Sequence, residues 1–391
     1  MIKLQKLSLV TVLTIIVAAP LQFPATAKTI KNLTEINDYY TELELLPHNK
    51  NQTTDTPQTE GIELVMTGSE YYKNHKYDLA IQSWKQAKNL FIAQGNRQGE
   101  GVTLGLLASA YTKLNSYAKA ITLYHQSLEI IQEFNLPELE ARFLSGLSVT
   151  YLLSGDYKNS IDYNQKSLEI SRKIGDHQTE VYSLVMLGYA SYHLRKYSEA
   201  IDYFQQSNSL FKKIGNTTGL APVLRYQGHA YLALGKYEQA LTAYQKSLEI
   251  YQQIDRPWEE ASILIGMGLI HLYQQKFPEA AESFSQSLAL SRETDNRSLE
   301  GRNLYFLGVI DGKQGKHKAA LKLYEKALVI FEKTGESEQK AITLYDIGVA
   351  YRYLGERSEA RKSYQQALAI FTELGQQKSV NMTRKQIQEL Q

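Results

Sequence analysis

The apolar positions of this chain recur with a period of 40 residues from about residue 60 to residue 376. Leucine opens each copy of the pattern, at positions 64, 104, 144, 184, 224, 264, 304 and 344. Sixteen residues later each copy has a small residue, at Ala80, Ala120, Ser160, Ala200, Ala240, Ala280, Ala320 and Ala360. Eight copies in phase, with no insertion, indicate a tandem repeat of one structural unit.

Each 40-residue unit predicts two helices joined by a short turn. In the seventh unit, Ala320, Tyr324, Ala327, Leu328 and Phe331 follow the spacing of one helix face. Glycines fall where several first helices should end, at Gly155, Gly235, Gly315 and Gly355. Between units, positions 95, 135, 175, 215, 255, 295, 335 and 375 are all Gly, Asn or Asp. These residue types tolerate positive φ best, so we expect a left-handed residue at these junctions.

A single helical hairpin cannot bury its own apolar face, so the repeated units must stack on one another. The predicted fold is therefore an all-α solenoid of eight helix–turn–helix units over residues 60–376. Residues 377–391 are polar and are predicted to form a C-terminal capping helix over the exposed end.

The repeated residues resemble the tetratricopeptide repeat (TPR) family. The eighth unit reproduces the family pattern most fully, with Leu344, Gly348, Tyr351, Ala360, Tyr364 and Ala367, and the fifth unit has Leu224, Gly228, Tyr231, Ala240 and Tyr244. The period of 40 and the absence of the family's usual proline are similar to a long-helix subclass that includes kinesin light chains and bacterial exported proteins. The resemblance implies a right-handed superhelix whose first helices line a concave groove for partner peptides.

The resemblance also implies which positions line that groove. Carried onto the eight units, the family's five groove positions give 40 residues, and none of them is Asp or Glu. The candidate partner-binding residues are tyrosines, arginines and histidines: Arg142, Tyr182, Tyr189, Tyr192, His193, Arg225, His229, Arg302, Tyr305, Tyr345 and Arg352. Tyr and Arg often anchor interfaces, and Arg can bind a carboxylate through two hydrogen bonds. We therefore expect an acidic or carboxylate-ended partner. The alternative is that these positions are half-buried and that the tyrosines only pack.

The sequence has no motif for catalysis, a cofactor or a metal. The HExxH, P-loop, GxGxxG and GxSxG patterns are absent, the histidines lie on different units without ligand spacing, and there is no Cys. We therefore predict a protein that is not an enzyme and that uses no cofactor and no metal. The formal net charge of +2 gives no electrostatic reason to expect nucleic acid.

The N-terminus has the pattern of an export signal. Lys3 and Lys6 precede an apolar run over residues 7–19, and Ala25-Thr26-Ala27 fits a cleavage site. We therefore expect a signal peptide at residues 1–27, a polar segment at residues 28–59, and a periplasmic or secreted protein without a membrane anchor after cleavage. The alternative is that the apolar run is retained as an anchor.

Two functions fit these observations. The first is a protein-interaction scaffold or adaptor that binds a partner protein or peptide outside the cytoplasm. The second is a peptide-sensing regulator whose superhelix changes shape on binding, which would require an output domain or a second binding face. Fold alone does not decide between them, because one repeat architecture carries many functions.

Overall fold

The computed structural model describes residues 57–390, and these residues form 17 helices and no strand. The predicted signal peptide (1–27) and most of the polar segment (28–59) lie outside the described residues. The predicted all-α fold of stacked helical hairpins is confirmed. The described helices group into two compact units, with the chain passing from one to the other between residues 234 and 235, and each unit is described by itself.

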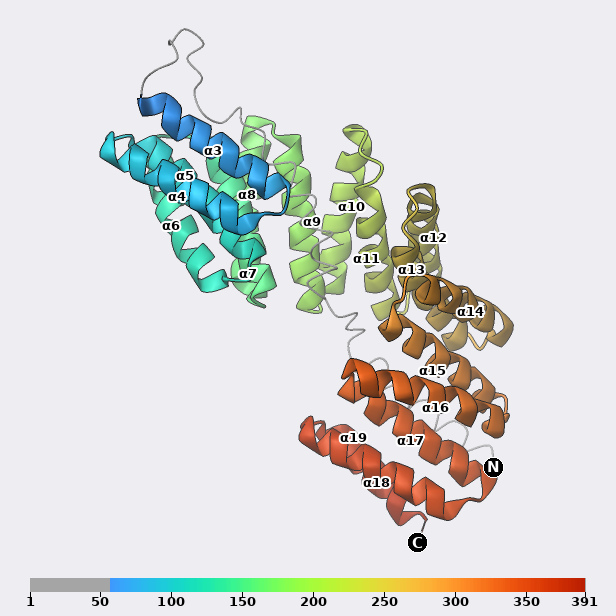
Figure 1. The fold of residues 1–391 in the computed structure, drawn as a ribbon. Helices are drawn as coiled ribbons and strands as arrows, with labels where there is room; N and C mark the ends of the chain where they lie inside the picture. The colour runs from blue at the N-terminus through green and yellow to red at the C-terminus, as the bar shows by residue number, and fades with distance from the viewer. Residues whose placement is uncertain (1–56, 391) are drawn as a thin grey trace. The chain divides into compact units, whose positions relative to one another are not determined.

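The N-terminal unit contains four consecutive hairpins followed by one further first helix (Figure 1). Its helices are α3 (Pro57–Lys73), α4 (Tyr77–Ala93), α5 (Arg97–Lys113), α6 (Tyr117–Glu133), α7 (Pro137–Leu153), α8 (Tyr157–Ile174), α9 (His177–His193), α10 (Tyr197–Lys213) and α11 (Leu220–Ala233).

The C-terminal unit begins with a second helix, continues with three hairpins and ends with a single helix (Figure 1). Its helices are α12 (Tyr237–Gln253), α13 (Pro257–Tyr273), α14 (Phe277–Glu293), α15 (Arg297–Lys313), α16 (His317–Thr334), α17 (Ser337–Leu354), α18 (Arg357–Glu373) and α19 (Gln377–Gln388).

The turns between helices follow a strict 20-residue rhythm. The expected positive φ is confirmed at all eight junction positions from 95 to 375 and at Gly155, Gly235, Gly315 and Gly355. The four remaining first helices end in the same conformation without glycine, at His75, Asn115, Arg195 and Gln275. Both kinds of turn therefore have a left-handed residue at the equivalent position, and the chain usually reverses within three residues; the longer exception is residues 214–219 between α10 and α11.

First helices are buried more completely than second helices. In the N-terminal unit α7 packs on α8, on the preceding α6 and on α9, the first helix of the next repeat. As a result α9 has buried residues around most of its circumference, whereas the second helix α10 buries one stripe. The first helices therefore form the inner layer of each stack and position the candidate binding residues.

Close helix contact within a hairpin depends on a glycine beneath an aromatic ring. A Cβ added at Gly188 of α9 would lie 2.4 Å from the ring of Phe204 on α10. The same contact joins Gly68 to Trp84 and Gly348 to Tyr364. Any side chain at these glycines would push the two helices apart, which explains why the repeat pairs glycine with an aromatic residue.

Polar links join helices both within a repeat and between repeats. Within a repeat, the serines that alternate with alanine in the pattern donate to backbone carbonyls of the first helix, as Ser127 does to Gly101 (2.7 Å) and Ser167 to Ala141 (2.7 Å). A residue near the end of a second helix also binds a residue eight positions later, in the first turn of the next helix. Such pairs are Gln132–Glu140, Arg172–Glu180, Arg292–Glu300 and, with the charges reversed, Glu332–Lys340.

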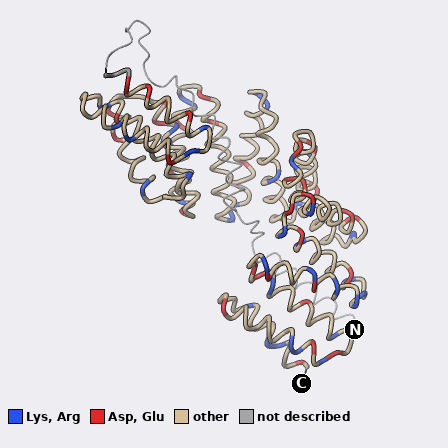
Figure 2. The backbone as a smooth tube through the Cα atoms, in the orientation of Figure 1, with Lys and Arg blue, Asp and Glu red and all other residues tan. Residues whose placement is uncertain are grey.

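The predicted capping helix α19 packs on α18 and covers the end of the last hairpin. It buries Val380 and Thr383, while Leu390 follows it into the same cluster. Lys and Arg are interspersed with Asp and Glu along the helices of each unit (Figure 2). None of the described helices is both long and apolar enough to cross a membrane.

Candidate binding surface on the first helices

The candidate residues fall into two sets, one in each unit. Helices α7, α9 and α11 of the N-terminal unit carry Arg142, Tyr182, Tyr189, Tyr192, His193, Arg225 and His229. Helices α15 and α17 of the C-terminal unit carry Arg302, Tyr305, Tyr345 and Arg352. All eleven lie on first helices, because the family positions that select them belong to the first helix of each repeat.

In the N-terminal unit Tyr189, Tyr192, His193 and His229 join through Tyr226 in one continuous aromatic cluster across α9 and α11. The Tyr189 and Tyr192 rings both meet the Tyr226 ring edge to face, with centroids 4.4 and 5.7 Å away. Tyr226 also meets the imidazole of His229 (5.6 Å), and the Arg225 guanidinium lies 4.9 Å from the Tyr226 centroid. Edge-to-face pairs of this kind add to the energy of burial, so the cluster fixes the two helices firmly.

Burial divides this cluster into a supporting layer and a reachable layer. The side chains of Tyr182, Tyr189, Arg225 and His229 are buried, whereas those of Arg142, Tyr192 and His193 are only half-buried. Burial, reinforced by the nearby Arg225 charge, holds the pKa of His229 well below its usual value. Burial likewise lowers the pKa of His193 and raises that of Tyr192. These pKa shifts favour the uncharged forms of His193, His229 and Tyr192. A partner can contact only the half-buried side chains.

Stacked ring pairs link each of three first helices to the preceding repeat. His193 stacks on Tyr157 with centroids 5.0 Å apart, Tyr273 on Tyr237 at 6.1 Å, and Tyr353 on His317 at 4.6 Å. Each pair joins the first residue of a second helix to the residue 36 positions later, at or near the end of the next first helix. Sequence reasoning missed these stacks, although aromatic residues 36 apart in alternate repeats were a usable signal.

In the C-terminal unit a buried carboxyl group lies among the candidate tyrosines. The Tyr305 hydroxyl on α15 donates a 2.7 Å hydrogen bond to Asp346 on α17, and both residues are buried. Burial raises the pKa of Asp346 to about 6, although the Tyr305 hydrogen bond and the Lys313 charge act in the opposite direction. Sequence reasoning missed Asp346 because it lies one position beyond Tyr345, outside the family's groove positions.

Both candidate arginines of the C-terminal unit already hold a carboxylate of this chain. The Arg302 guanidinium lies 3.4 Å from Glu336 at the start of the next repeat, and both side chains are largely buried. The Arg352 guanidinium lies 3.2 Å from Glu389 at the end of α19 and also bonds Gln386. In this structure both arginines are therefore paired with carboxylates of the chain itself.

The described helices contain no evident metal-binding cluster. Between residues 57 and 390, no group of three or more His, Asp or Glu side chains is arranged to hold a metal ion. The candidate residues and their neighbours are aromatic rings, guanidinium groups and, in the C-terminal unit, one buried carboxyl group.

Stacked helical hairpins of this geometry define the chain as an α-solenoid repeat protein. Models of the tetratricopeptide repeat match residues 103–138, 139–213, 219–293, 259–333 and 299–373. These matches cover well over half of the sequence, so the chain belongs to the tetratricopeptide repeat family. A search of curated proteins finds no significant match.

Several solved structures share the fold at low sequence identity. The apo form of RapI aligns with a TM-score of 0.64 and 15% identity, over 84% of this chain and 97% of that one. Aspartyl phosphate phosphatase F from Bacillus subtilis aligns with a TM-score of 0.55 and 14% identity, over 93% and 96%. A Rap protein complexed with competence and sporulation factor aligns with a TM-score of 0.51 and 14% identity, over 84% and 98%. Identities this low establish a common fold.

Proposed function

We propose that this chain is a non-enzymatic scaffold that binds an acidic or carboxylate-ended segment of a partner protein on its first helices. The observation that carries the proposal is the pairing of Arg302 with Glu336 and of Arg352 with Glu389. A guanidinium group has five N–H donors, and each ion pair is formed by a single guanidinium nitrogen. A partner's carboxylate can therefore share or replace the internal one.

Each unit also has rings on its first helices that a partner can reach. In the N-terminal unit Tyr192 and His193 of α9 are half-buried, and in the C-terminal unit Tyr273 of α13 is half-buried and Tyr353 of α17 is 47% exposed. Stacking or edge contacts with neighbouring rings hold them in place. Rings fixed before binding lose little conformational entropy when a partner packs on them.

We further propose that the protein works outside the cytoplasm, as a periplasmic or secreted protein. The basic, apolar and small-residue regions of residues 1–27 support this compartment, and so does the absence of Cys from the whole sequence. N-terminal sequencing of the protein from a fractionated native cell tests the proposal. A mature chain that begins near Lys28 in the envelope or medium is expected, and an intact Met1 in the cytoplasm would contradict it.

Binding is tested by titrating a fluorescent acidic peptide into the purified chain and its Arg352→Gln variant. Loss of a charge-assisted hydrogen bond costs about 1.5–3 kcal/mol, so the variant should bind at least tenfold more weakly. Glu389→Gln should strengthen binding because it removes the internal competitor. Lys362→Gln, an exposed cation on the second helix α18, is the matched control and should change nothing. Equal affinities for all four proteins would refute the charge argument.

A second candidate function is peptide sensing, in which binding changes the shape of the stack. The protein solved with competence and sporulation factor has the same fold, which makes this candidate worth testing. Small-angle X-ray scattering with and without a bound peptide separates the two candidates. A sensor should change its radius of gyration on binding, whereas a scaffold should keep it.

A further inference from the structure

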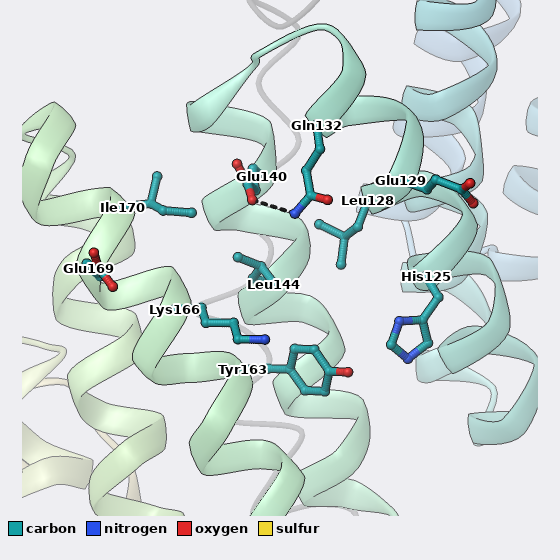
Figure 3. Close-up of a pocket in the computed structure, with 10 residues that line it drawn as sticks. All are labelled: His125, Leu128, Glu129, Gln132, Glu140, Leu144, Tyr163, Lys166, Glu169 and Ile170. Carbon is teal, nitrogen blue, oxygen red and sulfur yellow. Dashed lines mark hydrogen bonds between the residues drawn. The ribbon is translucent and has the colours of Figure 1, made fainter.

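The second helices of the N-terminal unit enclose a pocket that the first-helix surface does not explain. It has a volume of about 440 Å³ and opens between α6, α7 and α8. Figure 3 shows the α6 residues on one side, the α8 residues on the other and α7 between them. Its lining residues are His125, Leu128, Glu129, Gln132, Glu140, Leu144, Tyr163, Lys166, Glu169 and Ile170.

The pocket combines an apolar base with acidic flanks. Leu128 and Leu144 are buried in its base. Glu129 on α6 and Glu169 on α8 are exposed, while Glu140 on α7 is half-buried and accepts a hydrogen bond from Gln132. Against these three carboxylates the lining has one lysine, and Glu169 also forms a 2.6 Å ion pair with Lys173 of the same helix.

One wall of the pocket is an aromatic face that already holds a cation. The Tyr163 ring stacks on Tyr151 with centroids 5.4 Å apart and planes 2° apart, and the His125 ring meets its edge. The Lys166 ammonium lies 5.2 Å from the Tyr163 centroid. This contact shows that the Tyr163 face accepts a cationic group in this environment.

The sequence explains why the pocket forms at this junction. The tetrapeptide Ser-Leu-Glu-Ile occurs at 127–130, 167–170 and 247–250, and only the first two copies lie in successive repeats. Leu128 and Glu129 of the first copy and Glu169 and Ile170 of the second line the pocket on opposite sides of α7. The equivalent glutamate positions in the flanking repeats are Asn89 and Ser209, so two adjacent acidic flanks occur only here.

We propose that this pocket binds an arginine side chain of a partner protein. The apolar stem of arginine fits against Leu128 and Leu144, and its planar guanidinium fits the Tyr163 face and the flanking carboxylates. A metal ion is a poorer fit, because no three acids or histidines among residues 57–390 converge on one point.

The pocket would give the protein a second binding face. Glu140 and Leu144 are each two residues from Arg142 along α7, and two residues turn a helix by about 200°. The pocket therefore opens on the side of α7 away from the candidate groove position. A partner bound there leaves the first-helix surface free, and this inference stands or falls independently of the acidic-peptide proposal.

The test is a titration of Nα-acetyl-arginine amide into the whole protein, followed by NMR of labelled Leu and Ile methyl groups. We expect shifts at Leu128, Leu144 and Ile170. Nα-acetyl-citrulline amide, which has the same shape without the charge, and Nα-acetyl-lysine amide should give much smaller shifts. Equal shifts with either control compound, or shifts confined to the first-helix surface, would overturn the proposal.

Three variants sharpen the test because they should act in different directions. Removing exposed carboxylates weakens such contacts about threefold each, so the Glu129→Gln and Glu169→Gln double variant should bind about tenfold more weakly. Lys166→Gln should strengthen binding, because it removes the cation that competes for the Tyr163 face. Glu249→Gln, in the isolated third copy of the tetrapeptide, is the matched control and should bind normally. Weaker binding by Lys166→Gln with no effect of the double variant would identify an anion site and refute the proposal.

Discussion

The amide of Asn164 on α8 donates a hydrogen bond to the hydroxyl of Ser148 on α7, and both side chains are fully buried. Most other repeats place an aromatic ring on glycine at these two positions, as Phe204 and Gly188 do, and the second repeat has Tyr124 and Ala108 there. Ser148 also donates to the Ser160 carbonyl (2.8 Å). The third repeat therefore joins its two helices by a polar network where its neighbours use close packing.

This pairing predicts strong coupling between substitutions at the two sites. Ser148→Gly alone should destabilise the protein by about 1–3 kcal/mol, because the buried Asn164 amide loses its partner. Asn164→Phe alone should cost a similar amount through overpacking against Ser148. The double variant restores the ring-on-glycine contact and should be more stable than the sum of the two changes predicts. Urea unfolding of all four proteins measures the coupling, and additive effects would contradict it.

Asp346 predicts a pH dependence of stability in the C-terminal unit. Its pKa is raised in the folded protein from 3.8 to about 6, so between these pH values the folded state binds more protons than the unfolded state. Stability should therefore fall as the pH rises from about 4 to about 6, by up to about 3 kcal/mol. Asp346→Asn should remove this loss and remain stable at pH 7.

The Tyr305→Phe variant is the companion measurement. Its missing hydroxyl removes a hydrogen bond that stabilises the Asp346 carboxylate, so the pH at which stability is lost should move upward. Urea midpoints recorded from pH 4 to pH 7 would show the shift. If the urea midpoints of the native protein and of Asp346→Asn changed with pH in the same way, Asp346 would not be the source of the pH dependence.

The ion pair Arg172–Glu180 predicts that its charges can be exchanged. Arg172→Glu should destabilise the N-terminal unit by up to about 1 kcal/mol, because the pair is partly exposed. Adding Glu180→Arg should recover most of the loss, since Glu332 and Lys340 form the same link with reversed charges (3.0 Å). Thermal unfolding at low and at high salt checks the prediction, and no recovery in the double variant would refute it.

The left-handed turn residues predict stabilising glycine substitutions. Arg195 is exposed and has φ near 60°, which is unfavourable for a residue with a Cβ. Arg195→Gly should therefore stabilise the protein by up to about 1 kcal/mol. The reverse change, Gly155→Arg, meets no steric obstacle but should be destabilising because φ there is 85°. Melting curves that moved in the same direction for both variants would contradict this explanation.

The fold could be predicted from the sequence because it depends on patterns within single helices and turns, and these patterns recur in every repeat. The 40-residue period, the small residues and the junction residues at positions 95 to 375 are properties of single helices and turns, and the structure confirms them. The full hairpin count followed from the same period. The sequence also shows that Asn164 replaces the aromatic residue of the repeat pattern, but it does not show that Ser148 is the hydrogen-bond partner of Asn164.

The candidate surface was less predictable because its contacts join different repeats. The burial of Tyr182 and Tyr189 depends on how closely neighbouring first helices pack. The positions of motif residues along one helix do not determine the distance between two helices. The Tyr305–Asp346 bond spans 41 residues and the Arg302–Glu336 pair spans 34. Patterns within one repeat could not pair these residues, because the two members of each pair lie in different repeats.

The uniform 20-residue spacing of the left-handed turns has a consequence for how this protein can change in length. Because both kinds of turn have a left-handed residue at the equivalent position and most helices have 17 residues, equivalent points in any two repeats are interchangeable joints. Excising or duplicating a whole 40-residue block would preserve the phase of the helices and turns at the new junction. The array can thus be shortened or lengthened in whole modules, whereas the gain or loss of one residue within a helix would rotate all the side chains beyond it out of register.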